Sequence, residues 1–229
     1  MDTHPSSFYN SLAENQHLIF KDWSASIEWQ ASIFGPLLER SQPARRLRIL
    51  DCACGIGTQA LGLASRGHFV VATDLSAAAV ARARREATQR ALSLTFDVAD
   101  MCDLSTVAES GFDVVLAADN ALPHLNENQL QRAASSVAAK LAPGGTFVAE
   151  SGLRSSLPQR PTVHPTVHPP AFFTDRGRRR IVHQVWDWID DRTDIFHLYI
   201  TRETDAGWEY NHYVSLAGCE AANPGARTP

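Results

Sequence analysis

Residues 50–57 read Leu-Asp-Cys-Ala-Cys-Gly-Ile-Gly, and this stretch decides the fold prediction. A short apolar run precedes it at 47–50, and an alanine-rich apolar stretch follows at 59–64. This order is typical of a strand, a tight glycine turn and a helix. Gly55 and Gly57 would let the backbone approach a nucleotide closely, because a Cβ there would collide with the ligand or need a disfavoured φ.

Two classes of cofactor use such a turn, and the acid before it separates them. As Gly55-x-Gly57-x-x-Ala60 the turn fits the dinucleotide fingerprint, with Asp74 near the expected distance. Asp51 opposes this interpretation, because a carboxylate there would repel a pyrophosphate seated on the helix N-terminus. It suits S-adenosylmethionine, which has no phosphate and carries an ammonium and a sulfonium group.

Strands and helices alternate along the middle of the chain. We expect further strands at 69–74, 92–96, 112–118 and 146–150, with helices at 76–90 and 127–141. This alternation predicts an α/β fold with a doubly wound, Rossmann-like, mostly parallel sheet. In such sheets the ligand lies beyond the carboxyl ends of the strands. Four polar residues fall at those ends: Asp51, Asp74, Asp100 and Asn120. We expect Asp74 to bind both ribose hydroxyls, since a carboxylate offers two acceptors, although it could also cap the next helix.

The N-terminal segment is predicted to form two helices, the first over 6–20 and the second starting at Asp22. Gly35-Pro36 would bend or interrupt the second helix. These helices could simply cover one end of the sheet. Alternatively, Tyr9, His17 and Trp23 could close over the cofactor as a lid, because the glycine turn alone leaves a bound cofactor open to water.

The pattern changes after the fifth strand. Residues 157–170 are rich in proline and contain a tandem Pro-Thr-Val-His repeat at 161–168, which we interpret as an exposed loop. Alternating residues at 181–189, 194–202 and 207–215 predict three antiparallel strands. Their aromatic side chains could line a pocket or pack one face of the sheet. Their histidines fall one per strand with no fixed register, and we expect no metal site.

The composition excludes several classes of function. The chain has 229 residues, a net charge of −4 and a pI near 6.1, which argue against a broad nucleic-acid footprint. It has no run of about 18 apolar residues that would predict a membrane span, and no secretory signal. The four cysteines lack the spacing of a disulfide framework or zinc site, which favours a reducing cytoplasm.

Residues 50–57 resemble motif I of the class I S-adenosylmethionine-dependent methyltransferases, with Ala53 in place of the usual first glycine. The order Asp-Cys-Ala-Cys-Gly-Ile-Gly at 51–57 and Asn-Ala-Leu-Pro-His-Leu at 120–125 is similar to the glycine and sarcosine N-methyltransferases. The resemblance implies that Asp100 receives the adenine amino group, and that Met101 or Cys102 packs on the ring or donates a backbone N–H. The cofactor-binding residues expected from pattern and resemblance together are Asp51, Ala53, Gly55, Gly57, Asp74, Leu75, Asp100, Met101, Asp119, Tyr9 and Trp23.

The resemblance also implies a small-molecule methyl acceptor, most simply an amine. Asn120 would hold the amine, and His124 would orient a substrate carboxylate or assist proton loss, unless it only caps a helix beside Pro123. Methylation of a hydroxyl group, or cofactor binding without catalysis, are the alternatives.

We expect four parts of the chain: a helical cap at 1–41, a cofactor-binding core at 42–152, a loop and antiparallel lid at 153–215, and a disordered tail at 216–229. A class I sheet normally continues beyond the fifth strand, and no such strands are recognisable here. The fifth strand would then lie at a sheet edge with unpaired backbone groups. Low stability or a strand borrowed from another chain, as in a homo-oligomer, would follow.

Overall fold

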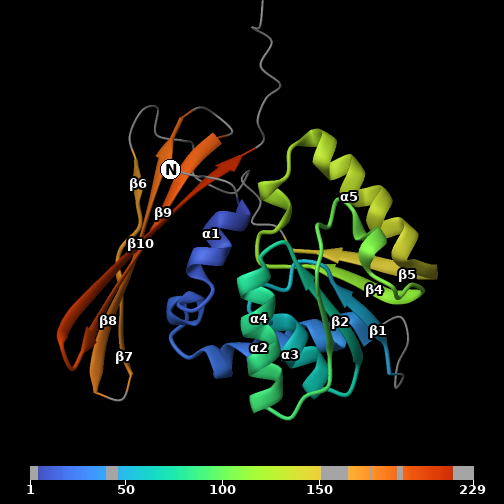
Figure 1. The fold of residues 1–229 in the computed structure, drawn as a ribbon, viewed down its shortest axis with the longest axis horizontal. Coiled ribbons are helices and arrows are strands. Elements are labelled where there is room, and N and C mark those ends of the chain that lie inside the picture. The colour runs from blue at the N-terminus through green and yellow to red at the C-terminus, as the bar shows by residue number, and fades with distance from the viewer. Residues whose placement is uncertain (1–4, 40–45, 151–164, 176, 190–192, 219–229) are drawn as a thin grey trace, which may run out of the picture.

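The computed structural model describes residues 5–39, 46–150, 165–175, 177–189 and 193–218. Figure 1 shows two sheets, with α1 lying between them. The helices are α1 (Pro5–Leu12), α2 (Trp23–Glu39), α3 (Thr58–Ser65), α4 (Ala77–Gln89) and α5 (Glu127–Lys140), with short 3₁₀ turns η1 (Gln16–Ile19), η2 (Leu104–Thr106) and η3 (Leu122–His124). The core sheet contains β1 (Arg48–Asp51), β2 (Phe69–Asp74), β3 (Thr95–Val98), β4 (Phe112–Ala117) and β5 (Leu141–Ala149). The second sheet, called the lid sheet below, contains β6 (Thr166–Val167), β7 (Ala171–Asp175), β8 (Arg178–Trp188), β9 (Thr193–Thr204) and β10 (Gly207–Gly218).

The core sheet is parallel throughout and confirms the predicted α/β class. Its strand order is β3-β2-β1-β4-β5, so β1 pairs with β2 on one side and with β4 on the other. Leu50 lies opposite Val71 and Val115. The chain therefore reverses direction across the sheet at β1, and in this topology a crevice opens beyond the carboxyl ends of the strands.

The three central strands of the core sheet, β1, β2 and β4, are buried on both faces, as is usual for parallel strands. Side chains of α2, α3 and α4 pack with Ile49, Val70 and Leu116 on one face. Side chains of η2 and α5 pack with Leu50 and Val115 on the other.

The N-terminal helices differ from their prediction. Instead of one helix over 6–20, α1 ends at Leu12 and η1 follows after a turn. The predicted start of the second helix is confirmed, because the Asp22 carboxylate accepts the Ala25 N–H at 3.0 Å. The helix is continuous through Pro36, so the predicted interruption is wrong, while the alternative of a bend stays a prediction. Pro36 lies exposed in the last turn of α2, where water can satisfy the carbonyl group that its missing N–H would leave unbonded.

The predicted third strand begins three residues too early, because 90–92 complete the preceding helix. Ala91 adopts φ 53°, its N–H bonds Thr88 O at 3.1 Å, and Leu92 N–H bonds Ala87 O at 2.9 Å. These contacts form a Schellman motif, which ends α4, and β3 therefore starts only at Thr95.

The fifth strand begins earlier than predicted. α5 ends at Lys140 and β5 starts directly at Leu141, with Gly144 at φ 77° inside it. The pairing with β4 shifts register between Phe112 and Val114. The Pro-Gly-Gly sequence thus forms an irregularity within the strand, rather than the connection that precedes it.

The three antiparallel strands predicted in the lid sheet are confirmed, and each is longer than expected. The sheet has the order β10-β9-β8-β6, with β7 also paired to β8. β6 and β7 were not predicted, because prolines surround them and β6 is only two residues long. Residues 216–218 continue β10 and do not belong to the predicted tail. Residues 157–164 of the proline-rich segment and 219–229 of the tail lie outside the described residues.

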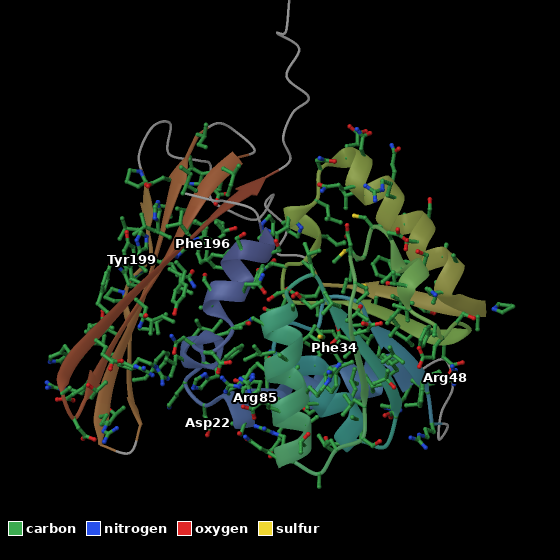
Figure 2. The ribbon with its side chains drawn as sticks, in the orientation of Figure 1. Asp22, Phe34, Arg48, Arg85, Phe196 and Tyr199 are labelled. Carbon is green, nitrogen blue, oxygen red and sulfur yellow. The ribbon has the colours of Figure 1, made fainter. Side chains whose placement is uncertain are left out.

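The aromatic side chains of the lid sheet divide between its two faces. Phe196 and Tyr213 face α1 and pack near Phe8. Tyr199 lies on the opposite face, where its ring stacks on His212 at 4.4 Å between centroids. Figure 2 shows Phe196 and Tyr199 on the two sides of β9. The aromatic side chains of the lid sheet therefore neither line a single pocket together nor all pack on one face of the sheet.

Candidate functional site

The glycine turn has the backbone that its sequence predicts. β1 ends at Asp51, α3 starts at Thr58, and between them Gly55 and Gly57 have φ values of 50° and 95°. A Cβ on Gly57 would lie 3.2 Å from both Ala83 Cβ and Leu61 Cγ. Gly57 therefore allows α3 and α4 to pack closely beneath the turn, and it also supplies the left-handed conformation.

Asp51 is the most unusual group of the turn. Its side chain is 1% exposed, and among the described residues Oδ2 has no hydrogen-bond partner. Burial, with a smaller contribution from the nearby Asp74 carboxylate, raises the pKa of Asp51 to about 7. A buried carboxylate oxygen without a partner is costly unless a ligand supplies a donor or a positive charge. A cationic ligand would fit this atom, whereas a pyrophosphate would not.

Asp74 ends β2 on the other side of the turn. Its two carboxylate oxygens accept the Gly55 and Ser76 N–H groups, both at 2.8 Å. The cap of α4 is Ser76, whose Oγ accepts the Ala79 N–H at 3.1 Å. Asp74 therefore does not cap the helix. Its carboxylate is held in place at the strand end, beside the half-exposed side chain of Leu75.

Asp100 lies close to Asp74, in the turn that follows β3. Ala99 N–H donates to Asp74 O at 3.1 Å, which fixes this turn against the end of β2. Asp100 Oδ1 accepts the Cys102 N–H at 2.8 Å, and Met101 between them is partly buried. Three acids thus follow three adjacent strands of the core sheet.

The fourth predicted position lies in strained backbone after β4. Asp119 and Asn120 have φ values of 59° and 61°, which are uncommon for residues other than glycine. Asp119 N–H donates to Glu150 Oε2 at 2.8 Å and anchors this turn to the end of β5. Strain of this kind concentrates at functional sites, and η3 with His124 follows directly.

Tyr9 connects α1 to this end of the sheet. Its hydroxyl group lies 3.1 Å from His124 Nε2, and the two rings meet edge to face. Burial raises the pKa of Tyr9 well above its usual value, and the nearby carboxylates of Asp119 and Asp74 raise it further. α1 therefore brings a phenol among the acidic strand ends.

Trp23 has different surroundings from Tyr9. It is buried, its Nε1–H donates to Thr58 Oγ1 at 2.9 Å, and the Arg90 guanidinium lies 5.1 Å from its ring. The structure thus places Trp23 in the packing of α2 against the start of α3. His17, from the same predicted lid, has its ring centroid 6.5 Å from that of Trp23.

The sequence did not identify Gln16 as a site residue. Its side chain is 8% exposed and lies against the glycine turn, so that a Cβ on Gly55 would be 3.4 Å from Nε2. The Oε1 atom is buried and has no hydrogen-bond partner within the described part of the chain. Gln16 lies within a run of four polar residues at 14–17, and nothing in that run distinguishes it from its neighbours.

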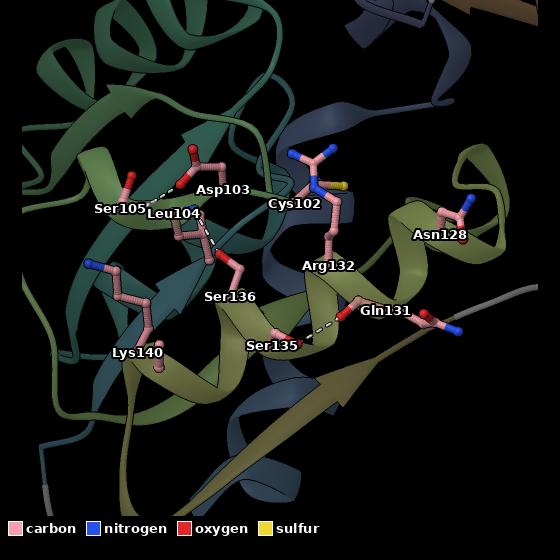
Figure 3. Close-up of a pocket in the computed structure, with 11 residues that line it drawn as sticks. Cys102, Asp103, Leu104, Ser105, Asn128, Gln131, Arg132, Ser135, Ser136 and Lys140 are labelled. Atoms are coloured by element: carbon pink, nitrogen blue, oxygen red, sulfur yellow. Dashed lines mark hydrogen bonds between the residues drawn. The ribbon is translucent and has the colours of Figure 1, made fainter.

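A separate hollow lies between η2 and α5 (Figure 3), and its lining meets the turn of Asp100 at Cys102. None of the other predicted site residues lines it. The Lys140 ammonium group at its edge donates to the carbonyl groups of Val107 and Glu109. We therefore place the candidate site at the strand ends and not in this hollow.

Comparison with known proteins agrees with this geometry. Residues 49–145 match the family model described as "Methyltransferase domain". The chain is 30% identical over 182 residues to the 2-heptyl-1-hydroxyquinolin-4(1H)-one methyltransferase of Mycobacteroides abscessus, covering 74% of this chain and 75% of that protein. It is 34% identical over 113 residues to the glycine/sarcosine N-methyltransferase of Parasynechococcus marenigrum, covering 49% of this chain and 39% of that protein.

Solved structures share the fold at low identity. DesVI from Streptomyces venezuelae has a TM-score of 0.70 at 20% identity, covering 95% of this chain and 84% of that chain. The SAM-bound amino pentose methyltransferase CalS10 from Micromonospora echinaspora has a TM-score of 0.69 at 21% identity, covering 86% and 78%.

Proposed function

Because the chain belongs to the class I S-adenosylmethionine-dependent methyltransferases, we propose that it methylates an amino group of a small molecule held near Asn120. The family establishes the cofactor and a small methyl acceptor, and the proposal concerns which atom is methylated and which residues take part. The observation that supports it best is the strained turn at Asp119 and Asn120, joined through η3 to the Tyr9–His124 contact.

The residues at the strand ends fit this cofactor. When bound, S-adenosylmethionine supplies a methyl group on a positively charged sulfur. Asp51 would face its positive charges, Asp74 would accept the ribose hydroxyl groups, and Asp100 with Met101 would hold the adenine. The unpartnered Oδ2 of buried Asp51 supports this assignment, because it needs a cationic neighbour.

The acceptor end is assigned from Asn120 and His124. Burial keeps the Tyr9 phenol protonated, and its hydroxyl group lies 3.1 Å from His124 Nε2. We assign the phenol as the donor of this bond, which would place the ring hydrogen of a neutral His124 on Nδ1. His124 would then act as a hydrogen-bond donor that orients an acceptor oxygen, such as a carboxylate. The Asn120 carbonyl oxygen would accept an amine N–H, and this positioning can supply roughly 7–11 kcal/mol in well-oriented reactions.

One observation favours a second candidate, methylation of a hydroxyl group. The Mycobacteroides abscessus relative, three quarters of whose length aligns with this chain, is named for a substrate that carries a 1-hydroxy group. In that case His124 would lie beside the hydroxyl group rather than a carboxylate.

Product analysis distinguishes methylation of an amino group from methylation of a hydroxyl group. The purified protein is incubated with methyl-labelled S-adenosylmethionine and a panel of glycine, sarcosine, an amino sugar and a 1-hydroxyquinolone. Labelled N-methyl product from one of the amines is the expected result. Label found only on hydroxyl oxygen would reject the amine assignment.

The role of Asn120 has its own test. Asn120→Ala should lower kcat at least tenfold, because it removes the acceptor of the amine N–H, while cofactor affinity measured by calorimetry changes less than about twofold. Asn120→Gly is the matched control for backbone strain, since glycine tolerates the φ of 61°. If either variant loses cofactor affinity and retains turnover, Asn120 does not bind the acceptor.

A further inference from the structure

We propose that Gln16 is a cofactor-binding residue, whose side-chain oxygen accepts a hydrogen bond from the methionine ammonium group of S-adenosylmethionine. Three observations about its position carry this inference. Gln16 belongs to η1, it is 92% buried, and its carboxamide lies against Gly55 of the glycine turn.

The unpartnered atom identifies what kind of group is recognised. Gln16 Oε1 can only accept a hydrogen bond, and no described residue donates one to it. A buried amide oxygen without a donor costs free energy, which a bound ligand with an N–H or O–H group would recover. The ligand at this turn must therefore present a donor toward η1.

Two unpartnered acceptors next to the same turn favour an ammonium group. Asp51 Oδ2 and Gln16 Oε1 are both buried and without donors among the described residues, and each adjoins the glycine turn. An ammonium group has three N–H donors and so needs more than one acceptor. The other donors of the cofactor are its ribose hydroxyl groups and adenine amine, which the proposed function assigns to Asp74 and Asp100.

The segment that carries Gln16 is held in place from several sides. Asn10 Oδ1 accepts the Ser76 hydroxyl at 2.8 Å, and Asn15 Nδ2 donates to the Tyr213 hydroxyl at 2.8 Å. Glu14 forms ion pairs with Arg82 and Arg85 of α4. Gln16 is thus positioned before the cofactor arrives, which favours a direct binding role.

The test compares two ligands that differ in the methionine portion. S-adenosylhomocysteine carries the ammonium group, whereas 5′-methylthioadenosine retains adenine and ribose without it. By isothermal titration calorimetry, Gln16→Leu should weaken S-adenosylhomocysteine binding roughly 10- to 100-fold, as expected for a hydrogen bond to a charged group. Binding of 5′-methylthioadenosine should change less than about twofold.

Two further variants complete the test. Gln16→Glu keeps an acceptor and should retain or increase the preference for S-adenosylhomocysteine over 5′-methylthioadenosine, which would support the proposal even if Gln16→Leu fails to fold. Gln131→Leu, on the exposed face of α5, is the control and should bind both ligands as the unmodified protein does. Equal loss of both ligands by Gln16→Leu, unchanged affinity for both, or a lost preference in Gln16→Glu would overturn the proposal. Failure of the unmodified protein to bind either ligand would instead contradict the cofactor sites in the proposed function.

Discussion

At the scale of single residues, Asp51 combines two opposing requirements. Its burial destabilises the charged form, yet a cationic cofactor needs that charge. Because the folded-state pKa of Asp51 is about 7 and the ordinary value is 3.8, Asp51 costs stability progressively as the pH rises from about 4 to about 7, and the cost levels off above 7. The free protein should therefore lose stability over this range, while the site gains affinity for a cation.

We predict that Asp51→Asn raises the free energy of unfolding of the cofactor-free protein at pH 8 by about 1–4 kcal/mol, because it removes the buried charge. At pH 4, where Asp51 is protonated in the folded state and only about half ionised in the unfolded state, the gain should be small. Urea unfolding at the two pH values measures this difference. Asp205→Asn, at an exposed turn position, is the control. A variant that is less stable than the unmodified protein at pH 8 would contradict the assigned burial cost.

The same pKa predicts proton release on cofactor binding. Below pH 7, bound S-adenosylmethionine should displace up to one proton from Asp51, so the affinity should rise as much as tenfold per pH unit and level off above pH 7. Calorimetry in buffers of different ionisation enthalpy would count the proton. A pH-independent affinity between 5.5 and 7 would show that Asp51 is already ionised in the free protein.

The sequence allowed the position of a site residue to be predicted where that residue directly follows a strand of the core sheet. Asp51, Asp74 and Asn120 each follow a buried apolar run, so their convergence follows from parallel topology alone. Tyr9 and Trp23 were indistinguishable, because helical spacing does not say what each face packs against. Gln16 could not be found, because its contact with Gly55 depends on the path of the chain between α1 and α2.

At the scale of elements, α5 has a defined start. Asn126 Oδ1 accepts the Gln129 N–H and Gln129 Oε1 accepts the Asn126 N–H, both at 2.9 Å, which forms a capping box. We predict that Asn126→Ala destabilises the protein by about 1 kcal/mol. Asn128→Ala, exposed two residues later in the same helix, should cost less than about 0.5 kcal/mol. Equal effects in denaturant unfolding would mean that the box contributes nothing.

Element boundaries were less predictable than element types. β3 starts later than predicted because Ala91 adopts a backbone conformation that glycine or asparagine usually occupies. The sequence therefore carries no clear signal of the Schellman motif. β7 forms a local hairpin with β8, in which Asp175 lies opposite Arg178, but the two prolines before it obscure the strand pattern. These differences change where strands begin, but they leave the core strand ends at the site in place.

At the scale of the whole molecule, α1 and η1 lie between the core sheet and the lid sheet (Figure 1). Phe8 and Leu12 pack with Leu198 and Ile200 of the lid sheet, while Tyr9 contacts His124 at the core. One short segment therefore holds both sheets together at the proposed site. Across the described ranges, no helix is both long and apolar enough to span a membrane.

The edges of the core sheet provide the last prediction. Among the described residues β5 pairs only with β4, and several of its side chains are exposed, including Phe147, whereas β4 is buried along its whole length. Amide groups of residues 146–149 that do not donate to β4 have no strand partner within the part of the chain that the structure describes. We expect these amides to exchange with solvent about 100-fold or more faster than those of Leu50 and Val115, whose strands lie inside the sheet.

Hydrogen exchange followed by mass spectrometry, at two protein concentrations and with the mass in solution measured at each, tests this directly. Protection that appears only at the higher concentration, together with dimer formation, would mean that a second copy covers the edge. Strong protection in a verified monomer would mean that residues outside the described ranges pair with β5, and the edge assignment would be wrong.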